Sequence, residues 1–315
     1  GLTVSASVRT TDGSTVSDVL AISSLDNPAD LPSIEELKKK VKDFADNLME
    51  LKETPMIEEY YTGPVLFEGG AASRLFTDNL LSPGRLLALR TMAPARGMLD
   101  EQLGRRIIDS RLTVKNYTTL AEYNGTPLFG CYEIDGDGVV PAAELTLVEN
   151  GVFKRMLNGR VPTLKAPEST GSARFMISPD NPMAIVSPGT IHVQASKGVG
   201  PEKLKKALLK AAKEADLEYA YIVRRIGGEA SAVYKVNVKD GKETRVRVNN
   251  LSAPELTKLM DLKGISSDER VMNYFPNGVP ASLIYPSAII VGDVEINRTT
   301  PKIEEEPVLK HPLQR

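Results

Sequence analysis

The residue types that most often bind catalytic metals are scarce in this chain. Its 315 residues include two histidines, His192 and His311, and one cysteine, Cys131. Zinc sites usually take three or four ligands from His, Cys, Asp and Glu at close local spacing, and no such grouping occurs here. We therefore expect no catalytic metal site built on histidine or cysteine. His192 alternates with apolar neighbours and is expected to be a structural or surface residue, and Cys131 is expected to be a small buried side chain in a strand.

Two short polar motifs suggest ligand binding without defining it. The run DGDG at 135–138 resembles the start of a calcium loop, but Thr146 stands where the closing Glu of such a loop belongs. A solvated turn is expected there. Ser169, Thr170 and Gly171 form a hydroxyl-rich run that can bind a phosphate or a peptide carbonyl. No phosphate-loop pattern accompanies this run, and the chain has no Gly-x-Ser-x-Gly nucleophile motif.

Glu68 stands where a strand-like segment changes into a helical one, and two glycines follow it. Glycine at the start of a helix costs about 1 kcal/mol relative to alanine, so a packing or access reason is expected. Gly69 and Gly70 would let another backbone, such as a peptide, approach closely, with Glu68 as a catalytic carboxylate. The alternative is tight packing of helix on sheet, with Glu68 favourably placed near a helix N-terminus.

The surrounding pattern predicts the elements that would position these residues. Ser33 and Glu36 form a capping-box pattern before an amphipathic helix over 33–52. A second amphipathic helix is predicted over 201–217. Strands are predicted at 2–8, 15–22, 145–148, 152–157, 219–224, 232–238, 244–248 and 288–295. Helices and strands do not alternate regularly, which favours an α+β fold with mixed, largely antiparallel sheets and a few amphipathic helices.

Bulk properties exclude several classes of protein. The formal charge of −2 and the pI near 5.9 leave no overall basic surface, so direct binding of nucleic acid is not expected. No run reaches the ~18 apolar residues of a transmembrane helix. A single cysteine excludes an internal disulfide, which fits a reducing compartment without requiring one.

Four stretches in consistent order resemble the TldD/PmbA family, also called modulator of DNA gyrase, whose members include metallopeptidases. These stretches are TGPVLFEGGAASRLF at 62–76, LVENGVFK at 147–154, the Ser-Thr-Gly run at 169–171 and VPASLIYPSAIIVGDVEI at 279–296. The resemblance covers roughly residues 2–296. It implies that residues 1–59 are the end of the central domain of the family. Residues 60–315 then form its C-terminal domain, with a loose tail from about 297, and the N-terminal domain of the family is absent.

The resemblance also implies a zinc site that this sequence has lost. Active members carry a His-Glu-x-x-x-His helix where this chain has Phe67, Glu68 and Ala72 at the three named positions. A further cysteine ligand of active members aligns with Met272. Without zinc, the pKa of water stays far above neutrality instead of falling to about 7. Glu68 is then a vestigial catalytic residue, and no cofactor is expected in this chain.

Three functions follow from these differences. The leading hypothesis is a non-catalytic subunit that accommodates a peptide, with Gly69, Gly70, Ser169, Thr170 and Gly171 as the peptide-binding residues, and that works with an active paralogue. The second hypothesis is an active metallopeptidase that takes ligands from a partner chain or a missing domain. The third is a purely structural or interaction protein whose cleft is filled by large side chains.

The resemblance further implies a homodimer or a heterodimer with a paralogue, and the apolar segment 281–291 is expected to contribute to that interface. Familiar members of the family are cytoplasmic, whereas longer homologues can carry export signals. The compartment therefore stays open.

Overall fold

The computed structural model describes residues 1–297 except 26, 28–30, 90–98, 164, 177–182, 228–229 and 249–250. Two predictions, the loose tail after residue 297 and the position of His311, therefore lie outside the described residues.

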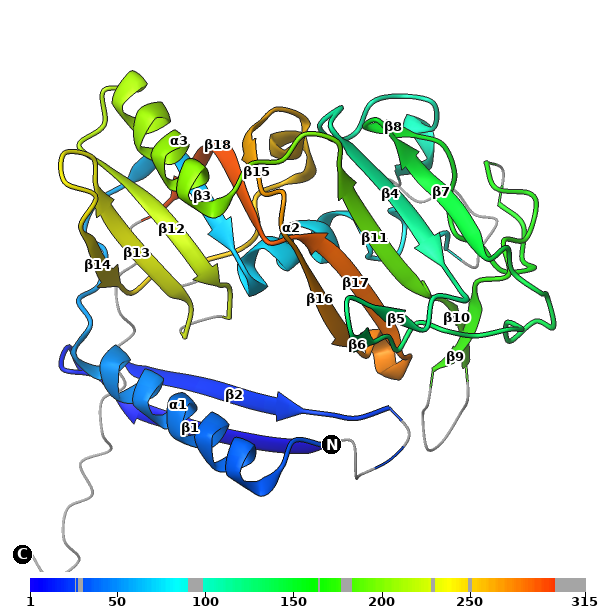
Figure 1. Ribbon diagram of the computed structural model, residues 1–315, viewed down its shortest axis with the longest axis horizontal. Coiled ribbons are helices and arrows are strands. Elements are labelled where there is room, and N and C mark those ends of the chain that lie inside the picture. Colours follow the sequence, from blue (N-terminus) through cyan, green and yellow to red (C-terminus); the bar gives the residue numbers. More distant parts are fainter. Residues whose placement is uncertain are drawn as a thin grey trace, which may run out of the picture.

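One mixed six-stranded sheet, called the β3 sheet, forms the left half of the molecule in Figure 1. Its strand order is β14-β13-β12-β3-β18-β15. The strands are β3 (Tyr61–Glu68), β12 (Tyr219–Arg225), β13 (Ala232–Asn237), β14 (Glu243–Val246), β15 (Leu262–Ile265) and β18 (Ala288–Ile296). β3 lies in the middle of this sheet, parallel to β12 and antiparallel to β18. Its two neighbours come from sequence positions more than 150 residues away.

A second six-stranded sheet, called the β11 sheet, forms the right half (Figure 1). Its order is β16-β17-β11-β4-β7-β8. The strands are β4 (Leu112–Tyr117), β7 (Glu144–Glu149), β8 (Val152–Phe153), β11 (Thr190–Ala195), β16 (Glu269–Tyr274) and β17 (Ala281–Pro286). β11 and β17 are parallel, and the other pairs in this sheet are antiparallel. The predicted hairpin between β7 and β8 is confirmed, since Asn150 and Gly151 both adopt positive φ, as a type I′ turn requires.

Smaller elements complete the described part of the chain. Three two-stranded sheets pair β1 (Leu2–Arg9) with β2 (Thr15–Ile22), β5 (Glu122–Tyr123) with β6 (Thr126–Pro127), and β9 (Ala173–Met176) with β10 (Met183–Val186). The helices are α1 (Ile34–Glu53), α2 (Gly70–Leu80) and α3 (Pro201–Glu214), with short 3-10 turns at Leu99–Gln102, Leu256–Met260 and Pro276–Gly278. None of the described helices has the length and apolarity needed to cross a membrane.

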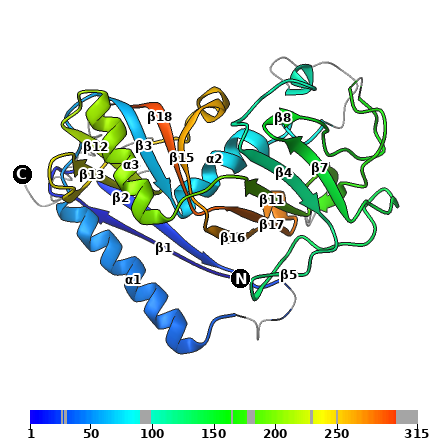
Figure 2. The same ribbon diagram turned by 45° about the horizontal axis from the view of Figure 1, so that its top comes forward.

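The β3 sheet has an apolar core on each of its two faces. α3 covers one face of the β3 sheet (Figure 2). Leu204 and Leu208 of α3 pack there with Leu66 of β3 in a small apolar core. α2 lies on the opposite face and contacts β3, β12 and β17 (Figure 1). The larger core on that side is continuous from the β3 sheet to the β11 sheet. The predicted α+β class with mixed, largely antiparallel sheets is confirmed.

The first part of the chain forms its own small layer. The capping box of α1 is present, since Ser33 N donates to Glu36 Oε2 at 2.9 Å and Glu36 N donates to Ser33 Oγ. α1 lies along the β1–β2 hairpin (Figure 2), and its buried residues Phe44, Leu48 and Leu51 pack with Val16 of β2. Ile34, at the start of the predicted amphipathic helix, shares the apolar spacing of Phe44 and yet is 71% exposed. Only the second half of the helix therefore docks.

One prediction about assembly is wrong. Segment 281–291 was expected to contribute to a dimer interface, but it forms β17 and the first part of β18, whose residues are almost all buried. Leu283 and Ile289 are fully buried in the larger core. Because the apolar side chains of this segment build the cores of both sheets, they are not available to a second chain.

Candidate functional site

The junction of β3 and α2 holds the residues that the sequence singled out. Side chains alternate between the two faces of a strand. Val65 and Phe67 accordingly point into the larger core, whereas Leu66 points toward α3. Glu68 continues the alternation and lies on the α3 side. The carboxylate of Glu68 and the ring of Phe67 are therefore on opposite faces of the β3 sheet.

Glu68 belongs to a chain of alternating charges on that face. Nε of Arg224 donates to Oε2 of Glu68 at 3.1 Å, and Nη2 of Arg224 donates to Glu243 at 2.8 Å. Nζ of Lys205, on α3, donates to the other oxygen of Glu243 at 2.7 Å. Burial alone would raise the pKa of Glu243, but the hydrogen bonds from Lys205 and Arg224 outweigh it and lower that pKa. This network ties the end of β3 to α3 and β14.

The backbone at Gly69 turns sharply into the helix. Gly69 has φ +55°, a conformation that favours glycine, and its N–H donates to the carbonyl oxygen of Ser287 at 2.8 Å. A Cβ atom at this position would lie 3.0 Å from Nη1 of Arg270. A long cationic side chain from β16 therefore already lies over Gly69. The predicted role of Gly69 and Gly70 in approaching a peptide stays a prediction, and Arg270 must move for it to hold.

Arg270 also reaches a tyrosine close to the first turn of α2. Burial raises the pKa of Tyr285, and the nearby Arg270 and Ser73 oppose that shift. Ser73 lies in α2 and is itself buried. The start of α2 is thus lined by the guanidinium of Arg270, the phenol of Tyr285 and the hydroxyl of Ser73, which already donates to the carbonyl oxygen of Gly70 at 2.8 Å.

The positions aligned with zinc ligands do not fit a zinc ion. Phe67 and Ala72 are each 0% exposed and belong to the larger apolar core, and neither side chain has a donor atom. Met272, on β16 opposite Leu283, packs against the same core and offers a single thioether. In the described residues no group of three His, Cys, Asp or Glu side chains is placed to hold a metal.

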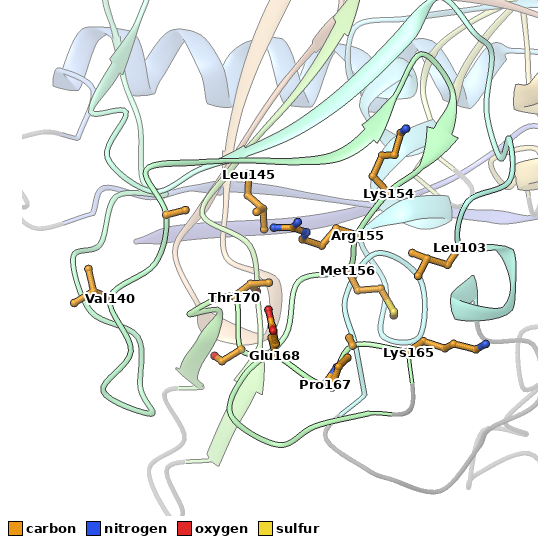
Figure 3. Close-up of a pocket in the computed structure, with 13 residues that line it drawn as sticks. Leu103, Val140, Leu145, Lys154, Arg155, Met156, Lys165, Pro167, Glu168 and Thr170 are labelled. Carbon is orange, nitrogen blue, oxygen red and sulfur yellow. The ribbon is translucent and has the colours of Figure 1, made fainter.

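The Ser-Thr-Gly run lies in a different place. Ser169 and Thr170 line a pocket of about 320 Å³ beside β7 and the segment after β8 (Figure 3). Thr170 is locked in place, because its hydroxyl both accepts from Asn158 N at 2.7 Å and donates to Asn158 O at 3.0 Å. Glu68, Gly69 and Gly70 do not line this pocket. The structure thus separates the five predicted peptide-binding residues into two sites.

The polar surroundings of His192 are a feature that the sequence does not indicate. The histidine is buried, as a structural residue should be, and its Nε2 lies 2.9 Å from Oε1 of Glu269. The other oxygen of Glu269 accepts a hydrogen bond from the hydroxyl of Tyr123 on the β5–β6 hairpin. This pair leaves no local signal in the sequence, because Glu269 is 77 residues from His192. The two residues lie on β16 and β11, with β17 between them in the sheet.

Two polar predictions need correction. Cys131 is exposed and lies outside the strands, because the segment that carries it leaves the sheet after β6. Asp135 is only 5% exposed. Its carboxylate accepts backbone N–H groups of Asp137, Val139 and Ala173. The turn at 135–138 is therefore organised by a buried aspartate and is not simply solvated.

These features define an α+β domain in which a strand-to-helix junction sits between two mixed sheets. Residues 60–298 match the family model described as the PmbA/TldA metallopeptidase C-terminal domain. This match covers most of the chain, which therefore belongs to the TldD/PmbA family.

Solved structures agree on the fold. TldE from Thermococcus kodakarensis is similar with a TM-score of 0.54 and 16% identity, over 90% of this chain and 58% of that one. A proposed modulator of a DNA gyrase from Thermotoga maritima gives a TM-score of 0.55 and 16% identity, over 94% of this chain and 61% of that one. The chain thus spans less than two thirds of either protein. No curated protein sequence matches it.

Proposed function

We propose that this protein is a non-catalytic member of the TldD/PmbA family that accommodates a peptide and acts as the partner of a zinc-bearing member. One observation carries the proposal: the two positions aligned with zinc-binding histidines hold side chains without donor atoms, fully buried in an apolar core. A metal ion there would need to displace well-packed carbon atoms and would gain no ligand from either residue. Peptide hydrolysis by zinc-bound water then has no basis in this chain.

The position of Glu68 supports the same conclusion. A general base must reach the water that it activates, within about 2.6–3.2 Å or through one water molecule. Glu68 faces α3 and is paired with Arg224, on the other side of the sheet from Phe67. An active peptidase would have to take its ligands from a partner chain and also reorient this carboxylate.

A purely structural or interaction role is favoured by one specific contact. The guanidinium of Arg270 lies over Gly69, in the space that a peptide backbone would need. Because the Arg270 side chain is exposed, it can swing away at the cost of few contacts. An Arg270→Ala variant separates the two roles: it strengthens peptide binding at the start of α2 if the arginine merely covers a site, and leaves binding unchanged if the site has been lost.

The experiment that tests the proposal compares three samples against an unfolded peptide substrate. These are the full chain alone, a zinc-bearing family member alone, and their equimolar mixture, all supplied with zinc. We expect no turnover by the full chain alone, and a heterocomplex in native mass spectrometry of the mixture. Chelator-sensitive hydrolysis by the full chain alone would overturn the proposal.

A further inference from the structure

The pocket lined by Ser169 and Thr170 combines an apolar wall with two charges of opposite sign. Leu103, Leu145 and Met156 supply apolar surface, and Arg155 and Glu168 supply the charges. In Figure 3 the guanidinium of Arg155 and the carboxylate of Glu168 point into the same space beside Leu145 and Thr170. The two lysines at the rim, Lys154 and Lys165, point away from that space.

The two facing charges are not used by the protein itself. Among the residues that the structure describes, the side chains of Arg155 and Glu168 form no ion pair or hydrogen bond, with each other or with a third group. The neighbouring Lys154 differs, since its ammonium pairs with Glu149 at 3.2 Å. An arginine and a glutamate that share a pocket without touching leave room for a ligand that pairs with both.

The wall that carries Glu168 is firmly built. Asn158 is fully buried. Its Nδ2 donates to the carbonyl oxygen of Ala166 at 2.6 Å, and its backbone N–H donates to Oγ1 of Thr170 at 2.7 Å. The segment 166–170 is thereby held at both ends. The hydroxyl oxygen of Ser169 accepts the N–H of Gly171, which leaves its hydrogen free to donate into the pocket.

These groups select the chemistry of the ligand. A carboxylate suits Arg155, which presents a planar fork of N–H donors, and it suits the hydroxyl of Ser169 equally well. A phosphate would bring about two negative charges beside Glu168 and would be repelled. A group with an N–H next to its carboxylate satisfies both charges at once. That combination is the end of a peptide chain, and an aliphatic last side chain fits the wall of Leu103, Leu145 and Met156.

We infer that this pocket binds the carboxyl-terminal residue of a peptide, with Arg155 and Ser169 on the carboxylate, Glu168 on the last N–H and the apolar wall on the side chain. The inference rests on the proposed function in that a peptide is the ligand. It adds which end of the peptide is held, and it places that end in a pocket that the start of α2 does not line.

The test measures binding of acetyl-Ala-Ala-Leu to the full chain by calorimetry, next to the same peptide with a carboxamide terminus. We expect the amide to bind about 10- to 100-fold more weakly, because a hydrogen-bonded charge pair is lost. Arg155→Gln weakens binding of the free acid by the same factor. Arg74→Gln, which removes an exposed arginine of α2 paired with Asp78, leaves binding unchanged. Both variants replace surface arginines and should keep the circular-dichroism spectrum of the parent.

Other outcomes would overturn the inference in distinguishable ways. If the parent and Arg155→Gln bind the free acid equally well, this pocket is not the binding site of the peptide terminus, and the proposed function is unaffected. Failure of the parent to bind either peptide also overturns the inference, whereas the proposed function is decided separately by the heterocomplex and by turnover of the unfolded peptide. If free leucine binds as tightly as the acetylated tripeptide, the pocket is a site for a single amino acid, and the assignment to a peptide terminus is wrong.

Discussion

Glu68 and Phe67 are adjacent in sequence and lie on opposite faces of the β3 sheet. Oε2 of Glu68 accepts a hydrogen bond of 3.1 Å from Nε of Arg224 on the α3 side. The ring of Phe67 is fully buried in the core on the α2 side. Phe67 and Glu68 belong to β3, whereas Ala72 belongs to α2. Phe67 and Ala72 are both buried in the larger core, and the alternation along the strand directs Glu68 away from them.

Replacing Glu68 should have little effect on stability. The ion pair with Arg224 is partly exposed, with 42% and 30% of the two side chains accessible, and such pairs contribute about 0–1 kcal/mol. We predict that Glu68→Gln lowers the free energy of unfolding by no more than about 1 kcal/mol, and by less in high salt. Urea titrations at low and high salt measure this. A loss several times larger would mean that Glu68 has a buried structural role.

Replacing Phe67, in contrast, should cause a large loss of stability. Its side chain is 0% exposed, and truncating a fully buried phenylalanine costs about 3–5 kcal/mol. We predict a loss of that size in Phe67→Ala by urea denaturation. The matched control is Phe175→Ala, because Phe175 is 54% exposed and should cost about 0.5 kcal/mol or little more. Equal effects of the two variants would show that Phe67 does not fill the core.

The stability of the β11 sheet should depend on pH through Glu269. Burial raises the pKa of this carboxyl, but hydrogen bonds from His192 and Tyr123 outweigh burial and lower the pKa below its ordinary value. A carboxyl with a lowered pKa in the folded state stabilises the protein above its ordinary pKa, and this contribution is lost as the pH falls through the folded value. We therefore predict that Glu269→Gln is less stable than the parent at pH 7.

Comparing the parent with Glu269→Gln at lower pH tests the direction of the pKa shift of Glu269. As the pH falls below about 4.5, the ordinary pKa of a glutamate carboxyl, the difference between parent and Glu269→Gln should shrink, because the parent also becomes protonated. Denaturant titrations at several pH values measure the difference. A gap that grows on acidification would contradict the direction of the pKa shift.

Arg247 should control the docking of the N-terminal layer. Its side chain is 2% exposed, and the guanidinium donates to the carbonyl of Thr54, the hydroxyl of Ser14 and the carboxylate of Asp12. Removing one partner of a buried ion pair costs about 3–5 kcal/mol. We predict that Arg247→Met loses stability in this range.

Limited proteolysis locates the effect of that change. Because Arg247 contacts Thr54 directly after α1, cleavage between α1 and β3 should become faster in Arg247→Met. Arg74→Met, at an exposed arginine, is the control and should be cleaved like the parent. Faster cleavage only within the β11 sheet would show that Arg247 has another role.

Local sequence signals specified local structure well. Ser33 and Glu36 placed the start of α1, and Asn150-Gly151 placed the β7–β8 turn, because a cap and a tight turn depend on a few adjacent residues. The capping pattern says nothing about what a helix docks on. Ile34 shares the apolar spacing of Phe44 and yet is exposed, since the β1–β2 hairpin covers only part of α1.

Long-range placement was beyond the sequence pattern. Nothing near Glu68 indicates that Arg224, 156 residues away, would become its partner, because the register between β3 and β12 depends on the whole sheet. An apolar segment such as 281–291 has the same sequence pattern whether its side chains contact a second chain or the core of their own sheets. The pairing of His192 with Glu269 likewise required the order of β11, β17 and β16.

Zinc binding by the purified full chain tests the central claim most directly. After dialysis against zinc-containing buffer, elemental analysis should find no zinc above the amount in protein-free buffer, because Phe67 and Ala72 supply no ligand. Stoichiometric zinc that is removed by a chelator, and that is not retained by a Met272→Ala variant, would contradict the loss of the metal site.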